Sequence, residues 1–350
     1  MKGFSINGMY HEGGQERVLK EILLELDCFI KPDQVEVVIP KWVHFEEEYK
    51  NIKIVRYGNS KRVIWLQLIF PFYLLRNNKL GVNMFNYCPI LRPDITLIHD
   101  LTARFLKKKK TTFVKHMVYI YGELCRCAAV KFGKHIITDS KNSKKDIINA
   151  YNIDPNKVTV LGTAWQHMER ITSDNDIFEK YPMLTPKNYY FSLGSVAVHK
   201  NFGWVKEVAK THKDDMFAIA GAIIASTTID DKIENSDNML YLGRVSDGEM
   251  KALLENCKGF IFPSFYEGFG IPPLEALSVG APIIISNTSC LPEIYEDAAH
   301  YIDPYNTDVC LNELLKETVA PAEKILSKYS WRKLAEEFYN ILVNVCDVKI

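Results

Sequence analysis

Short runs rich in Val and Ile alternate with segments of helical periodicity along most of the 350-residue chain. Parallel sheets built from βαβ units give this alternation, because their strands are buried on both faces and helices connect them. In the first half the pattern predicts strands at 2–6, 34–40, 52–57, 82–88, 95–101, 135–139 and 158–161, and helices at 16–26, 62–76, 112–131 and 140–151. In the second half it predicts strands at 189–193, 216–220, 239–242, 259–263, 282–286 and 300–302, and helices at 201–211, 246–256 and 272–278.

The alternation stops over residues 162–186, which are polar and rich in Asp and Thr, and then begins again. We therefore expect an α/β protein of two Rossmann-like domains, 1–165 and 166–330, which face a central cleft where ligands bind. Residues 331–345 carry one apolar helical stripe, and their periodicity alone allows packing on either domain.

The charge is balanced over the whole chain but not along it. There are 43 Lys and Arg against 43 Asp and Glu, and hydrophobic residues make up 47%, which is ordinary globular composition and argues against a uniformly basic nucleic-acid binder. Residues 1–165 carry 26 basic against 16 acidic residues, whereas 166–350 carry 17 against 27. A basic half suits an anionic or membrane-bound substrate, although the two halves could equally be complementary to each other.

Targeting and redox features are plain. The eight cysteines include no C-x-x-C pair or zinc-spaced cluster, which favours a reducing cytosol. The N-terminus lacks the apolar core of a signal peptide, and the longest apolar run, 63–75, is too short to span a bilayer. We therefore expect a cytoplasmic protein with no integral membrane segment.

The strongest chemical signal is a glycine-rich turn between a strand and a helix, Phe262-Pro-Ser-Phe-Tyr-Glu267-Gly268-Phe269-Gly270-Ile-Pro-Pro-Leu-Glu275. Glycines let backbone amides approach a ligand, and the helix N-terminus offers donors to oxyanions, so the turn suits phosphate or sugar hydroxyls. Glu267 and Glu275 can both face such a ligand and accept from its hydroxyls. The alternative is a capped helix in which Glu275 only complements the helix dipole.

A second turn, Gly194-Ser195-Val-Ala-Val-His199-Lys200-Asn201, follows the first strand of the second half. Lys200 can point its ammonium at a diphosphate there, or it can be a solvated lysine at a helix end. In the first half, Gly13 and Gly14 lie between a strand and a helix, and His99 and Asp100 end a buried strand. The alternatives to a functional role are an ordinary flexible turn, a core histidine and, for Asp100, a carboxylate that caps the following segment.

The stretch from Phe262 to Glu293 closely resembles the signature region of the family 4 glycosyltransferases, the glycosyl transferases group 1 domain. Glu267 and Glu275 match its two glutamates, and the Gly-Gly turn, His-Asp pair and Gly-Ser…Lys-Asn element occur in the family's order. The resemblance implies a GT-B fold, with an N-terminal acceptor-binding domain at 1–165, a nucleotide-sugar-binding domain at 166–330, and residues 331–350 returning to the first domain. It implies transfer of a sugar from a nucleotide-sugar with retention of configuration.

The resemblance also assigns roles to residues. His99, Lys200 and Glu267 would be catalytic: His99 at the donor sugar, Lys200 at the leaving diphosphate, and Glu267 at the sugar hydroxyls. Glu275 would bind the ribose and Asp100 would contact the acceptor. The further donor-binding residues would be Gly13, Gly14, Ser195, Arg244, Gly268, Phe269 and Gly270. Many relatives carry an Arg near the position of Lys200, where this chain has His199 and Ser195.

The expected partners follow from the same resemblance. They are a nucleotide-sugar donor and a saccharide or lipid-linked saccharide acceptor of bacterial surface polysaccharide synthesis, with no cofactor, no metal and no nucleic acid. The Lys107–Lys110 run before an aromatic, apolar helix predicts weak contact with an anionic membrane, at its inner face, unless it is a solvated loop. Two alternatives to a transferase are a nucleotide-sugar epimerase and a non-catalytic nucleotide-sugar-binding subunit.

Overall fold

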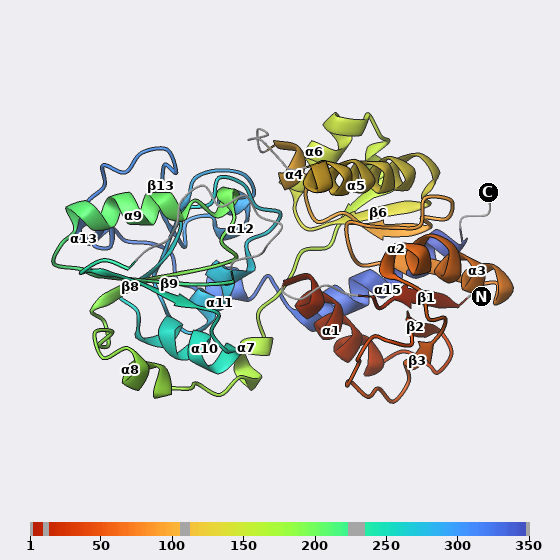
Figure 1. The fold of residues 1–350 in the computed structure, drawn as a ribbon, viewed down its shortest axis with the longest axis horizontal. Helices are drawn as coiled ribbons and strands as arrows, with labels where there is room; N and C mark the ends of the chain where they lie inside the picture. Colours follow the sequence, from red (N-terminus) through yellow and green to blue (C-terminus); the bar gives the residue numbers. More distant parts are fainter. Residues whose placement is uncertain (1–2, 10–13, 106–112, 223–234, 348–350) are drawn as a thin grey trace. The chain divides into compact units, whose positions relative to one another are not determined.

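The computed structural model describes the chain except for residues 1–2, 10–13, 106–112, 223–234 and 348–350 (Figure 1). It divides into two compact units. The first comprises Met1–Ala103, Thr112–Thr163 and Trp331–Ile350, and the second consists mainly of Ala164–Ser330. The predicted border after residue 165 lies two residues from the observed one.

The sheet of the first unit is parallel, in the order β3-β2-β1-β4-β5-β6-β7 within the described residues. Its Val- and Ile-rich strands are mostly buried because helices cover both faces. The strands are β1 Phe4–Asn7, β2 Val35–Ile39, β3 Lys53–Arg56, β4 Leu80–Asn83, β5 Ile95–Leu97, β6 His135–Thr138 and β7 Val158–Val160. The helices are α1 Gly14–Asp27, α2 Arg62–Ile64, η1 Trp65–Ile69, α3 Phe70–Arg76, α4 Thr102–Phe105, α5 Phe113–Phe132 and α6 Lys141–Tyr151.

The predicted helix 62–76 forms as one continuous segment with a π-helical turn, η1, in its middle. Pro71 has no N–H to donate to the carbonyl four residues earlier, and the wider turn ends just before it, where the Phe70 N–H bonds to the Trp65 carbonyl. The helix therefore passes a proline without breaking.

Two predicted strands are wrong in part, since β4 covers Leu80–Asn83 instead of 82–88 and β5 ends at Leu97 instead of 101. Gly81 discourages a strand prediction, but a Cβ there would lie 2.7 Å from Leu74 Cδ1, so the helix packs where a side chain would project. After β5, the His99 N–H bonds to the Asn86 side chain, and the chain leaves the sheet.

The second unit repeats the design with a parallel sheet in the order β10-β9-β8-β11-β12-β13 among the described residues. Its strands are β8 Tyr189–Leu193, β9 Met216–Ala220, β10 Met239–Gly243, β11 Gly259–Phe262, β12 Ile283–Ser286 and β13 His300–Ile302. Its helices are α7 His167–Arg170, α8 Asp176–Lys180, α9 Phe202–Thr211, α10 Asp247–Asn256, α11 Ile271–Ser278, α12 Leu291–Tyr295, α13 Leu311–Leu314 and α14 Glu323–Leu326. Thus α7 and α8 form within residues 162–186, where the sequence pattern predicts only a linker.

The last helix, α15 Trp331–Asp347, belongs to the first unit and lies beside α1 (Figure 1). Tyr339 meets the Phe29 ring edge to face at 6.0 Å, and the Arg332 guanidinium lies 4.5 Å from the centre of the same ring. Trp331, Phe338 and Leu342 are buried. No helix among the residues that the structure describes is both long and apolar enough to cross a membrane.

Candidate functional site

The second unit has a point where its strand order reverses, between β8 and β11. Open parallel sheets bind ligands outside the carboxyl ends of the strands at such a point. The loops that follow the two adjacent strands run in opposite directions there and leave a crevice between them. The turn with Lys200 follows β8, and the turn with Glu267 follows β11. The fold therefore brings both sequence-predicted turns to one place.

Lys200 and Glu267 form an ion pair in which Nζ and Oε1 lie 2.7 Å apart. The two side chains are only 14% and 10% exposed, and the ammonium also lies 4.9 Å from the centre of the Phe262 ring. The alternative of a solvated helix-end lysine is therefore wrong. A shielded cation and a carboxylate lie side by side at the switch point, where a diphosphate and a sugar could bind.

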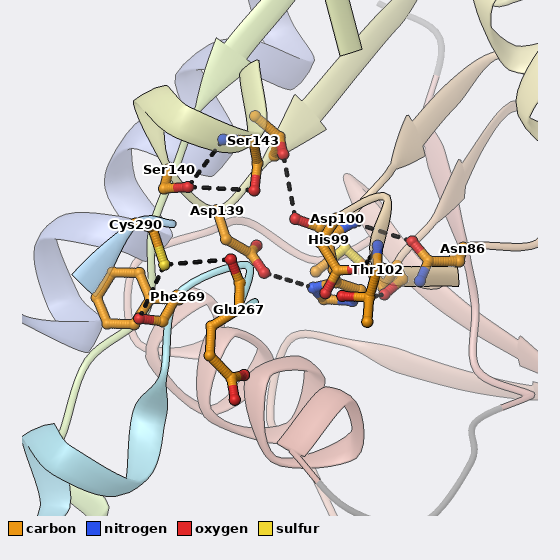
Figure 2. Close-up of polar contacts among 12 residues, drawn as sticks. Asn86, His99, Asp100, Thr102, Asp139, Ser140, Ser143, Glu267, Phe269 and Cys290 are labelled. Carbon is orange, nitrogen blue, oxygen red and sulfur yellow. Dashed lines mark hydrogen bonds and ion pairs between the residues drawn. The ribbon is translucent and has the colours of Figure 1, made fainter. Parts of the chain in front are cut away.

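The backbone of the Glu267 turn is fastened to the turn after β12. Ser289 Oγ accepts from the Glu267 N–H at 2.9 Å and donates to the Glu267 carbonyl at 2.7 Å. The Cys290 thiol bonds to the carbonyls of Glu267 and Phe269, as Figure 2 shows. These contacts fix the backbone position from which the Glu267 side chain extends.

The Lys200 turn is held equally well. Asn201 adopts a left-handed conformation (φ 54°), and its amide donates to the carbonyls of Pro263 and Pro304 at 3.0 and 2.9 Å. The Phe265 N–H bonds to the His199 carbonyl at 2.8 Å. The two turns are thus joined by backbone contacts as well as by the ion pair.

Glu275 lies inside α11, 5% exposed, and its Oε1 is 2.8 Å from His167 Nε2. His167 is itself 3% exposed and comes from the short helix α7. Glu275 lies beyond the first turn of α11, where the helix-dipole effect has fallen off, so the dipole alone does not account for its position. Glu267 and Glu275 instead have separate cationic or donor partners.

The start of α11 depends on Gly270, which has φ +88°. A Cβ there would lie 2.8 Å from Leu291 Cδ2, and the Tyr295 hydroxyl donates to the Gly270 carbonyl. Gly268 is buried, and the buried Phe269 ring packs edge-on against Tyr329 at 5.2 Å. Phe269 is thus a core side chain, so only its backbone is available to line a ligand.

The remaining predicted donor residues follow β8 and β10, which lie on either side of β9. Ser195 is half-buried after β8, and Arg244 is exposed after β10. Between them, a Cβ on Gly221 would lie 1.7 Å from the Gly194 carbonyl oxygen, so the strand ends approach too closely for any side chain at that position.

In the first unit, His99 is 6% exposed and bridges two strand ends (Figure 2). Its Nδ1 lies 2.8 Å from Asp139 Oδ2, and its Nε2 lies 3.2 Å from the Met84 carbonyl. Both partners are acceptors, an arrangement that favours the imidazolium form, in which both ring nitrogens donate. Burial lowers the pKa of His99, but the Asp139 carboxylate outweighs it and holds the pKa above the usual 6.5.

Because the folded pKa of His99 is raised, its stabilising effect is complete below the unfolded pKa and is lost as pH rises through the folded one. Asp139→Asn should therefore lower the free energy of unfolding by about 2 kcal/mol at pH 6 and by clearly less at pH 10. Urea denaturation at both pH values measures this. An equal loss at the two pH values would show that the histidine is neutral.

The other first-unit residues are placed as follows. Asp100 Oδ1 accepts from the Thr102 N–H at 2.9 Å, the capping arrangement that the sequence left open beside an acceptor role. Gly14 begins α1. Gly13 and the Lys107–Lys110 run lie outside the described residues.

The sequence analysis missed several residues that support the site, among them His167, Ser289 and Asp139. Asp139 had a usable signal, because it follows β6 just as His99 follows the neighbouring β5. His167 and Ser289 had none. In the part of the chain that is described, no three His, Cys, Asp or Glu side chains gather as metal ligands do.

The chain is similar in sequence to known proteins. Residues 173–321 match the family model of the glycosyl transferases group 1. The chain is 27% identical over 256 residues to the O-antigen chain mannosyltransferase RfbU of Salmonella typhimurium, and this match covers 72% of the chain and 63% of the relative. It is 40% identical over 95 residues to O-antigen chain mannosyltransferase B of Escherichia coli, covering 27% of the chain and 23% of that relative.

The fold has equally clear neighbours. A sucrose-phosphate synthase of Thermosynechococcus elongatus superposes with a TM-score of 0.72 at 11% identity, covering 100% of both chains. The Anabaena protein HepE, solved with UDP-glucose, superposes with a TM-score of 0.68 at 14% identity, covering 98% of this chain and 100% of that one. The chain thus matches less than two thirds of the length of the mannosyltransferases, but it shares its whole fold with the solved structures. Residues 173–321 thus match the glycosyl transferases group 1 domain, and the chain has the GT-B fold of two Rossmann-like domains.

Proposed function

We propose that the chain is a glycosyltransferase that moves a sugar from a nucleotide-sugar to a saccharide or lipid-linked acceptor in bacterial surface polysaccharide synthesis. The observation that carries the proposal is the largely shielded Lys200–Glu267 pair at the switch point of the second unit. The names of the O-antigen mannosyltransferases support the polysaccharide assignment.

The pair suits the chemistry of this transfer. As the bond between the anomeric carbon and the diphosphate breaks, negative charge grows on the departing phosphate oxygen, and the ammonium of Lys200 stabilises it. Glu267 accepts from hydroxyls of the transferred sugar and so orients it. Glu275, buried beside His167, accepts from the ribose hydroxyls.

We propose a front-face reaction with retained configuration. The leaving phosphate oxygen takes the proton of the acceptor hydroxyl on the face that the acceptor attacks, so no enzyme nucleophile is required. In this scheme Lys200 compensates the negative charge of the departing diphosphate, and no metal takes part. The product's anomeric coupling in an NMR time course reports the stereochemistry, and undiminished turnover in EDTA would support the metal-free step.

The donor is best identified by a thermal-shift screen. Wild-type protein is heated with GDP, UDP, dTDP or ADP and their sugar conjugates, with GDP-mannose and UDP-glucose first because the named relatives are mannosyltransferases and HepE was solved with UDP-glucose. A ligand at 100 times its dissociation constant should add roughly 2.7 kcal/mol of stability. The Glu275→Ala variant should lose the shift for that nucleotide series. Absence of any stabilising nucleotide would contradict the proposal.

We propose in addition that the protein works at an anionic membrane surface. The support is α5, whose first residues, Phe113 and Val114, are 79% and 69% exposed and follow the Lys107–Lys110 run in the sequence. An amphipathic helix beside a cluster of cations is suited to the interface of such a membrane. Failure to bind anionic vesicles at low salt would overturn this part of the proposal alone.

A further inference from the structure

The helix α2–η1–α3 exposes a row of large apolar side chains. Ile64, Leu68, Phe72 and Leu75 recur every three or four residues, which places them along one helix face, and they are 48%, 61%, 55% and 67% exposed. Exposed apolar residues are usually scattered singly, whereas a continuous row marks a surface that contacts something.

Two more apolar side chains lie beside this row. Trp42, which is 46% exposed, donates from its indole N–H to the Ser60 carbonyl at 2.8 Å, next to the start of the helix. Leu91, which is 88% exposed, follows Ile90, whose N–H bonds to the Gln67 side chain at 2.9 Å. Trp42 therefore flanks the row at its start, and Leu91 flanks it near its middle.

The helix α5 contacts the α2–η1–α3 helix through Gln67 and Tyr121. Gln67 donates from its amide to the Tyr121 hydroxyl at 2.8 Å, and Tyr121 stacks on Tyr87. The exposed apolar side chains of α5 include Phe113, Val114, Met117, Val118 and Leu124. We call the row on α2–η1–α3, Trp42, Leu91 and these α5 side chains the helix-pair surface.

Charge is distributed unevenly around the helix-pair surface. The sequence has no Asp or Glu between Tyr49 and Pro93, but eight Lys and Arg. Of these, Lys61, Arg62 and Arg76 are exposed at the two ends of the row. On α5 the carboxylate is Glu123, which pairs with Arg126 at 2.6 Å. The surface is therefore apolar with a cationic border.

We infer that the helix-pair surface lies on an anionic lipid bilayer, with its apolar row at the boundary between headgroups and acyl chains and its cations at the level of the lipid phosphates. This inference rests on the proposed membrane contact. It assigns the principal contact with the bilayer to the α2–η1–α3 helix instead of to residues 107–110. A two-fold dimer through this face would bring its cations against each other, which disfavours a second copy as the occupant. A bilayer also requires no complementary shape.

The test is flotation of the full chain with vesicles of phosphatidylcholine alone or with 30% phosphatidylglycerol. The Leu68→Ser/Phe72→Ser variant should bind the anionic vesicles about tenfold or more weakly, because two large apolar side chains leave the interface. Arg62→Glu/Arg76→Glu should weaken binding at low salt and flatten its salt dependence. The matched control is Leu24→Ser/Met183→Ser, which changes exposed apolar residues elsewhere and should bind like wild type.

Placement has its own readout. Vesicles should shift the tryptophan emission of wild type to the blue, and Trp42→Phe should remove most of that shift while leaving binding largely intact. Unchanged binding by the Leu68→Ser/Phe72→Ser variant would overturn the inference. So would a concentration-dependent dimer that this variant abolishes. Transfer to a soluble acceptor should be unaffected in all these variants, so loss of membrane binding and loss of the proposed activity are separate outcomes.

Discussion

Replacement of Lys200 with alanine should lower kcat by about 100- to 1,000-fold, with a much smaller change in KM for the donor. The ammonium acts mainly where negative charge develops, on the departing diphosphate, so its loss is felt more in the transition state than in the bound donor. Steady-state kinetics with the donor found by thermal shift measure this.

The ion pair makes the experiment sharper. Glu267→Gln should also reduce kcat, and the double variant should lose less than the sum of the two single losses, because the residues contact each other at 2.7 Å. Lys210→Ala is the matched control, since Lys210 pairs with Glu207 on the exposed face of α9 and should leave kcat unchanged. A Lys200→Ala enzyme that turns over normally would refute the charge-stabilising role.

Replacement of Glu275 with alanine should weaken nucleotide binding by about 10- to 100-fold, the usual cost of losing hydrogen bonds to a charged group. His167→Ala should also weaken nucleotide binding, but indirectly. The Glu275 carboxylate then loses the hydrogen-bond donor, 2.8 Å away, that fixes its position. Calorimetric titration with the free nucleoside diphosphate measures both, without any acceptor.

Rescue separates positioning from folding. His167→Gln retains a side-chain N–H donor and should recover much of the affinity, whereas His167→Leu keeps bulk without a donor and should not. Wild-type affinity in the His167→Leu variant, with its melting temperature unchanged, would contradict a positioning role for His167.

The strands of the second unit could be predicted closely from the sequence. Those at 189–193, 216–220 and 300–302 have the predicted bounds. The first two are largely apolar runs enclosed by a polar residue and a glycine. The short helices α7 and α8 could not be predicted, because they lack a full apolar stripe. Tertiary contacts hold them in place, such as the bonds from the Lys251 ammonium to the carbonyls of Met168 and Ile171. Tertiary packing decides such elements.

The candidate site divides in the same way. Lys200, Glu267 and Glu275 are recognisable because glycine-rich turns mark them. The residues that hold them are not, because the contacts close over long stretches of chain. His167 meets Glu275 across 108 residues, and Asp139 meets His99 across 40. Nothing local in either segment indicates its partner, and only the completed sheets bring them together.

The return of α15 to the first unit also governs when that unit can finish folding during synthesis. Phe29, which lies two residues after the end of α1, meets its partner Tyr339 only after residues 164–330 of the second unit have been made. The second unit, mainly Ala164–Ser330, is a nearly continuous stretch and emerges from the ribosome before that helix does. The unit that is translated first therefore completes its folding last. A chain truncated before Trp331 would leave an apolar face of the first unit exposed, and we expect chaperones and proteases to bind it.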